Sequence, residues 1–135
     1  MSDHESALQR ALIVWLRDDT RIRALLGHPA RVWDQSPADK VFPHLVIGRS
    51  ESRPVEADGC GVAHALTLSC VSRQGGAEET KAICAAVRDR LAEAVLQADG
   101  VRTIGLRVTF TDVFRTSDQR RTSGVMRVRA VTEDI

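Results

Sequence analysis

The first candidate for chemistry is the glycine pair Gly75-Gly76, which separates a strand-like run from a helix-like run. A strand, a glycine turn and a helix can together bind a phosphate, because the first backbone N–H groups of the helix point at the ligand. Here Glu78 and Glu79 occupy the first helical turn, where they complement the helix dipole and would repel a phosphate. The Walker pattern is absent. We therefore expect a strand-to-helix corner that holds no nucleotide.

A second glycine motif, Gly-Cys-Gly at residues 59–61, resembles the start of a dinucleotide-binding fingerprint. The third glycine of that fingerprint is missing, and the segment leads into a strand-like run through His64. The fingerprint works only where a strand passes into a helix N-terminus, so this motif predicts no cofactor site.

The titratable residues form no catalytic or metal-binding set. The four histidines are scattered, and none stands at metal-ligand spacing from another ligand type. We expect His64, on the apolar face of its strand, to be a satisfied core or strand-end histidine. Asp112 falls between Phe110 and Phe114; it is either a lone acid with a raised pKa or, more simply, a partner of an arginine such as Arg127. The serine-hydrolase motif Gly-x-Ser-x-Gly is also absent, so we expect no catalysis, metal or cofactor.

Cysteine usage favours a reducing compartment. The three cysteines are odd in number and form no Cys-x-x-Cys motif. Cys70 and Cys84 fall in apolar patterns, where a free cysteine acts as a small hydrophobe, and Cys60 lies in a glycine-rich loop without an adjacent basic residue.

Charge and hydropathy exclude two further classes. The formal net charge of +1 argues against a dedicated nucleic-acid binder, although Val101–Ile135 contains seven arginines and four acids. The apolar run Ala11–Leu16 is too short to span a membrane and has the wrong flanks for a signal peptide. We therefore expect no membrane association and a cytoplasmic protein, unless it travels inside an assembly.

The N-terminal elements that must position any site are helical. Ser2-x-x-Glu5 predicts a capping box for a helix that runs to about Asp18, and Asp19 predicts the cap of a short helix that stops at Gly27. The first helix carries one apolar stripe, formed by Leu8, Ala11, Leu12, Trp15 and Leu16. Ile13 and Val14 are apolar but lie off that stripe, which is typical of a helix covered on a second side, for example by another subunit.

The remaining pattern predicts strands around a second long helix. Short strands are expected at 31–33 and 44–49, and residues 50–61 are read as a mobile loop or a ragged hairpin. A strand follows at 62–71, and the helix after Gly76 has an apolar seam, formed by Ile83, Val87, Leu91 and Val95.

Two long strands close the chain, at 104–114 and from Val125 onward. In the first, parity places Ile104, Leu106, Val108, Phe110 and Phe114 on one face and Arg107, Thr109, Thr111 and Arg115 on the other. We therefore predict a single domain over residues 1–135 of the α+β class, with a mostly antiparallel sheet and helices packed on one face.

The opposite sheet face is polar and arginine-rich, and it holds our candidate site residues. Arg107, Arg127 and Arg129 face either a neighbouring subunit's acids, or passing DNA, or only solvent. Trp33 is the fourth candidate, since tryptophan is enriched at interface hot spots, although most tryptophans are core residues.

Four stretches of the chain resemble a family of small phage tail-completion proteins, the tail terminators of long-tailed phages, with relatives in prophages and gene transfer agents. The matching text is "ALQRALIVWLRDD", "ALLGHPARVWDQSPADKVFPHLVIG", "HALTLSCVSRQGGAEETKAICAAVRDRL" and "LRVTFTDVFRTSDQRRTSGVMRVRAVTE". The similarity covers nearly the full chain and consists of hydrophobic patterns and turn residues, with residues 50–61 matching only loosely.

The resemblance implies a structural virion protein that is made in the host cytoplasm and ends in the tail of the particle. Such proteins form a ring, commonly a hexamer, on the finished tail tube, where they stop polymerisation and offer a surface to the head–tail connector. Its partners would be further copies of the chain, the tail tube protein and the connector, with DNA only passing through the ring. No enzyme activity or cofactor is implied.

A ring subunit needs two complementary patches, because its contacts are head-to-tail. The candidates are the arginine-bearing sheet face, residues 50–61 and the region around Trp33. Two rival functions remain at this stage: a neck or head-completion protein, and a non-catalytic small-molecule binding module with a pocket against the sheet.

Overall fold

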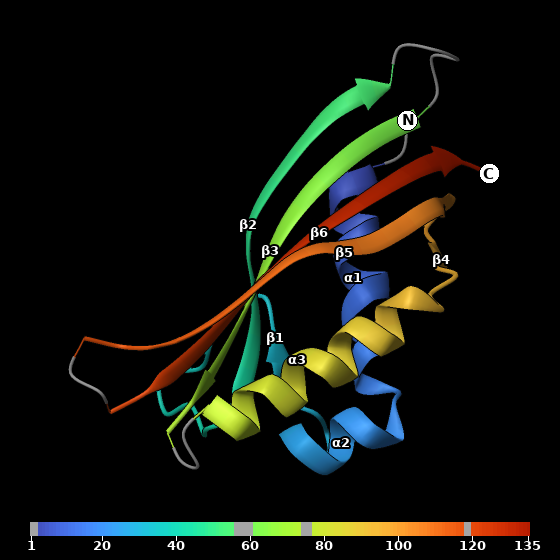
Figure 1. The fold of residues 1–135 in the computed structure, drawn as a ribbon. Helices are drawn as coiled ribbons and strands as arrows, with labels where there is room; N and C mark the ends of the chain where they lie inside the picture. Colours follow the sequence, from blue (N-terminus) through green and yellow to red (C-terminus); the bar gives the residue numbers. More distant parts are fainter. Residues whose placement is uncertain (1–2, 56–60, 74–76, 118–119) are drawn as a thin grey trace.

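The computed structural model describes residues 3–55, 61–73, 77–117 and 120–135 (Figure 1). Its first helix, α1 (His4–Arg17), begins after Asp3, whose side chain accepts a hydrogen bond from the Ser6 N–H at 3.0 Å. The prediction that Ser2 caps this helix was wrong, since Asp3 is the N-cap and Ser2 lies outside the described residues. An aspartate caps a helix as well as a serine does and also complements the helix dipole, so Ser2 and Asp3 were both suitable N-caps by residue type.

The two other helices start and stop close to the predicted places. α2 (Thr20–Leu26) is capped by Asp19, as predicted, and ends at Gly27, which has a φ of 87°. α3 (Ala77–Ala92) buries Ile83, Val87 and Leu91, but it ends before Val95, which is 79% exposed. The apolar seam therefore has three members inside the helix, and Leu96 instead of Val95 enters the core.

The strands form one six-stranded sheet in the order β1-β2-β3-β6-β5-β4. The strands are β1 (Val32–Trp33), β2 (His44–Val55), β3 (Gly61–Ser72), β4 (Gln97–Ala98), β5 (Val101–Arg115) and β6 (Thr122–Asp134). Of the two readings of residues 50–61, a mobile loop or a ragged hairpin, the described part agrees with the hairpin: residues 50–55 continue β2 and pair with β3, after a register shift between Ile47 and Ser50.

The fold is α+β, but the predicted mostly antiparallel sheet with helices on one face needs correction. The sheet is mixed, because β1 pairs parallel with β2, while the other neighbouring strands pair antiparallel. It is also strongly curled and twisted, so the helices pack along a bent surface instead of a flat layer (Figure 1). A two-residue strand such as β1 carries too little periodicity to reveal its partner or direction.

The core lies between the helices and alternate residues of the central strands. On β3 and β6 every second residue is buried, which gives a common inward row through the sheet. Leu68 and Met126 oppose each other in this row, and Leu12, Leu16 and Val87 from the helices are also fully buried. Burying each such side chain contributes about 1.5–3 kcal/mol, so this row dominates the stability of the fold.

Two β-bulges in β5 change which of its side chains point to the core, so the prediction that its apolar residues share one face was wrong. The pairing with β6 shifts between Thr103 and Gly105 and again between Val108 and Phe110. A bulge adds one residue to one strand and therefore reverses the parity of everything beyond it. Leu106 and Val108 pack against the core as predicted, but Ile104, Phe110 and Phe114 are 58%, 50% and 44% exposed.

Gly124 on β6 lies where side chains of α3 come close to the sheet backbone. A Cβ built there would lie 2.7 Å from the Cys84 sulfur and 2.8 Å from a side-chain carbon of Thr80. Both neighbours are buried, and neither can move without disturbing the packing of α3.

Replacing Gly124 with alanine should therefore destabilise the fold by about 1–3 kcal/mol through overpacking. The matched control is Gly105→Ala, because a Cβ at Gly105 meets nothing within 4 Å; it should change stability by no more than about 0.5 kcal/mol. Urea denaturation of both variants measures the difference. Equal midpoints for the two variants would contradict the tight approach of α3.

Candidate interface on the open face of the sheet

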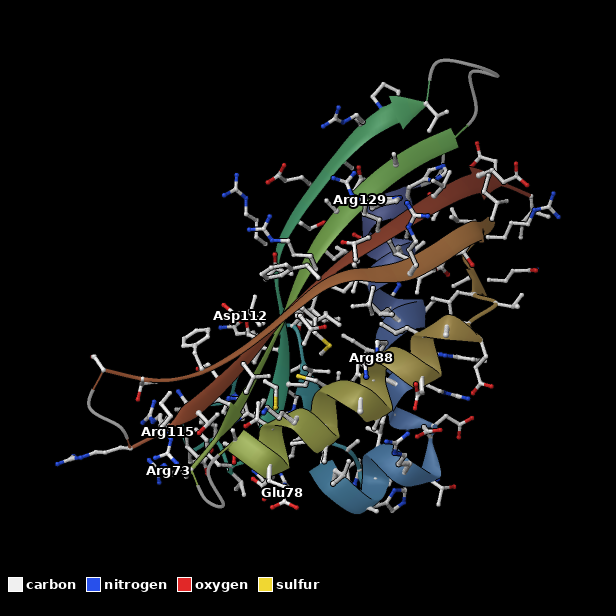
Figure 2. The ribbon with its side chains drawn as sticks, viewed as in Figure 1. Arg73, Glu78, Arg88, Asp112, Arg115 and Arg129 are labelled. Carbon is white, nitrogen blue, oxygen red and sulfur yellow. The ribbon has the colours of Figure 1, made fainter. Side chains whose placement is uncertain are left out.

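The side chains that point away from the core along β1, β3, β5 and β6 form a surface, called the open face below, which collects all four predicted site residues. The register places Arg127 opposite Thr67 and Arg129 opposite Ala65, both in the outward parity of β3 and β6. Arg107 lies opposite Arg129, and Trp33 shares this face through its pairing with Val46. Figure 2 shows Arg129 on the central strands. Residues that are distant in sequence are thus joined on one surface.

The arginines of the open face repel each other. Arg107 and Arg129 are direct cross-strand partners and both are exposed. Like charges in this position destabilise an antiparallel pair. Ala65 separates Arg129 from Glu51, because it pairs with Arg129 on one side and with Glu51 on the other. The Glu51 carboxylate is already 2.8 Å from the guanidinium of Arg49. The row therefore has an excess of positive charge that a partner's carboxylates or phosphates could neutralise.

A shallow hollow of about 670 Å³ lies on this face between β2 and β5. Its lining includes Arg49, Glu51, Thr67, Phe110, Arg127 and Arg129. The guanidinium of Arg127 sits 5.6 Å from the centre of the Phe110 ring. Arginine and aromatic side chains are the residues enriched at protein–protein hot spots, so the composition is typical of an interface.

A second aromatic group lies at the end of the sheet where β2 begins. The His44 ring is 5.4 Å from the Trp33 ring and 4.8 Å from the Phe42 ring, centre to centre. The guanidinium groups of Arg73 and Arg121 lie 4.3 Å and 5.0 Å from the Phe42 ring. Burial lowers the pKa of His44, and the hydrogen bond that its Nδ1 donates to the Val41 carbonyl at 3.2 Å offsets this only in part.

The two tryptophans have different roles. The Trp15 indole N–H donates to the Arg90 carbonyl at 3.0 Å, and the Arg90 guanidinium stacks 3.6 Å from the ring centre. Trp15 thus serves packing between α1 and α3. Trp33 is half-buried on the open face, where an aromatic side chain can still contact a partner.

Sequence reasoning missed a cluster of buried polar side chains on the core side of the sheet. The Thr132 hydroxyl, fully buried, lies 2.7 Å from His4 Nδ1 and 2.8 Å from His64 Nε2. His4 Nε2 also lies 3.1 Å from Asp134 Oδ1, which ties the start of α1 to the end of β6. Residues 4, 64 and 132 share no local pattern, so only the fold brings them together. The prediction that His64 is a core histidine is confirmed, but only its Nε2 is satisfied, since the buried Nδ1 has no hydrogen-bond partner among the described residues.

The other sequence candidates gain no chemistry from the fold. Gly75-Gly76 and Gly59-Cys60 lie outside the described residues. At the start of α3, Glu79 accepts a hydrogen bond from the Ser72 hydroxyl, which ties the end of β3 to the helix. Asp112 is exposed, and none of the ion pairs among the described residues includes it. The expected pairing with Arg127 is therefore not seen, and Arg127 lies over Phe110 instead.

Within residues 3–55, 61–73, 77–117 and 120–135, no three histidine, cysteine or acidic side chains cluster in a way that could hold a metal. None of the described helices combines the length and apolar character that crossing a bilayer requires.

Burial raises the pKa of the Cys84 thiol and, more strongly, that of Cys70, so both are protonated and unreactive.

Comparison with protein-family models shows a match to "Tail completion protein gp17" over residues 10–133. The chain belongs to this family. Membership identifies it as a structural tail protein, in agreement with the resemblance seen in the sequence. A comparison with curated proteins found no match.

The family assignment agrees with the solved structures. The chain of this tail completion protein superimposes on a chain from "Virion of native gene transfer agent (GTA) particle" with a TM-score of 0.87 and 25% sequence identity. The match covers 98% of this chain and 99% of that chain. The likeness therefore extends over nearly the full length of both chains.

The histidine cluster gives the tail completion protein a predictable response to acid. Burial lowers the pKa of His64 below its ordinary value of 6.5, and the Glu5 carboxylate offsets this only in part. In the unfolded chain His64 takes up a proton as the pH falls through 6.5, while the folded chain does so only at lower pH. The contribution of His64 to the free energy of unfolding should therefore be fully present above pH 6.5 and decrease as the pH falls below 6.5.

Urea midpoints measured at about pH 7.5 and about pH 5.5 should show this loss. His64→Gln should make the loss smaller without removing it, because His44 shifts in the same direction. His28→Gln, at an exposed histidine, is the control and should keep the wild-type loss. A loss of equal size in the His64 variant would show that His64 is not the group responsible.

Proposed function

We propose that this protein is a tail terminator, which caps the finished tail tube as a ring and offers a docking surface to the head–tail connector. The observation that carries the proposal is the match over the whole length of both chains to a protein of a gene transfer agent virion. Together with membership of the tail completion family, it favours a role at the end of the tail. The protein would be made in the host cytoplasm and then join the particle, be it a phage, a prophage product or a transfer agent.

The open face supplies the surface that a ring subunit needs. A closed ring uses heterologous contacts, so each copy must present one patch to a neighbour on each side. Arg107, Arg127, Arg129 and Trp33 all lie on this face by strand parity, and Arg127 and Arg129 line its hollow together with Phe110. The direct Arg107–Arg129 opposition is unfavourable in an isolated subunit. In the ring it would be relieved by acids of the neighbour or by the phosphates of passing DNA.

The ring has six copies in this proposal, following the commonest arrangement in the family that the sequence resembles. Its two sides contact the tail tube protein and the connector. No cofactor takes part, because every step is a protein–protein contact and no bond is made or broken.

Deleting the gene tests the function directly. Particles made without the protein should show overlong or headless tails in negative-stain micrographs, and the wild-type gene supplied in trans should restore them. Tails of normal length that carry heads would exclude a terminator.

Charge reversal at the open face tests the interface. Arg127→Glu with Arg129→Glu should convert the assembled protein to monomers, because the surface then repels the acidic partner it attracted. The matched control is Lys81→Glu with Arg88→Glu, two exposed positions on α3 with the same change in charge. Size-exclusion chromatography with light scattering gives the mass of each. Unchanged assembly of the open-face variant would count against this surface.

A further inference from the structure

The hydrogen bonds in the histidine cluster at the start of α1 all run in one direction. The His4 Nε2 atom lies 3.1 Å from a carboxylate oxygen of Asp134, so this nitrogen carries the hydrogen. A neutral His4 then has a bare Nδ1, which accepts from the Thr132 hydroxyl at 2.7 Å. That hydroxyl has a single hydrogen, so its oxygen accepts from His64 Nε2 at 2.8 Å. The bonds therefore lead from His64 at one end to Asp134 at the other.

The His64 end of the cluster is a bare nitrogen. A neutral His64 holds its one hydrogen on Nε2, and its Nδ1 atom is buried without a hydrogen-bond partner among the described residues. Buried polar atoms without a partner are rare in folded proteins. A buried lone pair at the end of a chain of hydrogen bonds is a place where a proton can bind.

An added proton changes His64 Nδ1 by either route into the cluster. It can bind that nitrogen directly. It can instead bind His4 Nδ1, which then donates to the Thr132 oxygen and turns the Thr132 hydrogen toward His64 Nε2. For Nε2 to accept, the hydrogen of His64 must move to Nδ1, because a neutral imidazole carries only one. Both routes put an N–H on the buried Nδ1 of His64, and that N–H needs an acceptor.

The Glu5 carboxylate is the acceptor that the fold places nearby. Ser52 on β2 is the direct cross-strand partner of His64, so the two side chains share one face of the sheet. Glu5 accepts a hydrogen bond from the Ser52 hydroxyl at 2.6 Å. This bond lowers the pKa of Glu5 below its ordinary value of 4.5, so the carboxylate stays charged while His64 titrates. Its charge also raises the pKa of His64, against the larger effect of burial.

The other charged groups around His64 are not available to its Nδ1. Asp134 already accepts from His4, and Asp3 on α1 is held by the Ser6 N–H. The charged residues that flank the site on β2 and β6 point to the open face by strand parity: Glu51, Arg53, Arg129 and Glu133.

We propose that this cluster is an acid-sensitive switch in which Glu5 exchanges partners. In the neutral protein Glu5 binds the Ser52 hydroxyl and ties the start of α1 to β2. After proton uptake Glu5 turns to the Nδ1–H of His64 and ties α1 to β3 instead. The switch goes beyond the proposed terminator role and does not depend on it.

Histidine-ring NMR of the full chain follows the proton. At about pH 7.5, His64 should carry hydrogen on Nε2 only, and in acid its Nδ1 should gain one. Glu5→Gln should lower the pH midpoint of this change by about 1 unit, because the acceptor loses its charge. Ser52→Ala should raise the midpoint, since it releases Glu5. The control Glu51→Gln makes the same change of charge beside Ser52 but on the open face, and should keep the wild-type midpoint.

Double-mutant cycles from urea midpoints test the exchange of partners itself. Coupling between Glu5 and Ser52 should be present at about pH 7.5 and lost below the measured His64 midpoint, whereas coupling between Glu5 and His64 should appear only below it. An unchanged His64 midpoint in Glu5→Gln, or shifts of the same sign in Glu5→Gln and Ser52→Ala, would overturn the proposal. So would a His64 Nδ1 that already holds hydrogen at the higher pH, or that gains none before the chain unfolds.

Discussion

The packing of the helices against one row of β3 and β6 is the constraint on which the rest of the structure depends. Twelve consecutive residues of β3 pair with β6 without a shift, so the inward row is continuous from His64 to Ser72. The close approach of α3 at Gly124 fixes the distance between the layers. This row holds the large buried residues of the two central strands, such as Leu68 and Met126, whereas the outward row can carry polar side chains such as Arg127 and Arg129. The arginines of β6 therefore share one surface because side chains alternate between the two faces along β3 and β6, and these strands pair without a register shift.

The edge strand β5 follows different rules from the central pair. Its two bulges interrupt the alternation of side chains between the two faces. Apolar residues at even-numbered positions therefore point to both faces of the sheet. Leu106 and Val108 stay in the core, whereas Phe110 and Phe114 turn outward. The open face consequently combines exposed phenylalanines with arginines, as at Arg127 over Phe110. Local irregularity, and not only composition, gives this surface the chemistry of a contact site.

The sequence predicted the elements that local signals encode and missed those that depend on distant pairing. Both long helices, the Asp19 cap and the stop at Gly27 were predicted within a few residues, because capping and helical periodicity act over one or two turns. The parallel β1–β2 pair, the bulges and the His4–Thr132–His64 cluster escaped, since each requires knowledge of which strand lies beside which. The common face of Arg127 and Arg129 was predicted because β6 keeps its period of two, and Arg107 joins them because it pairs with Arg129 between the two bulges of β5. Joining Trp33 to them required the sheet order.

The bulges of β5 have another consequence, for the subunit before it enters a particle. Beyond the two residues that pair with β4, the outer side of β5 has no neighbouring strand in the described chain. A long, regular edge of this kind invites indiscriminate stacking of chains into fibrils during the time that newly made subunits accumulate. Broken spacing of the backbone N–H and C=O groups denies such stacking a regular template. The same irregularities that expose the phenylalanines would thus keep a pool of unassembled protein soluble until its proper place becomes available.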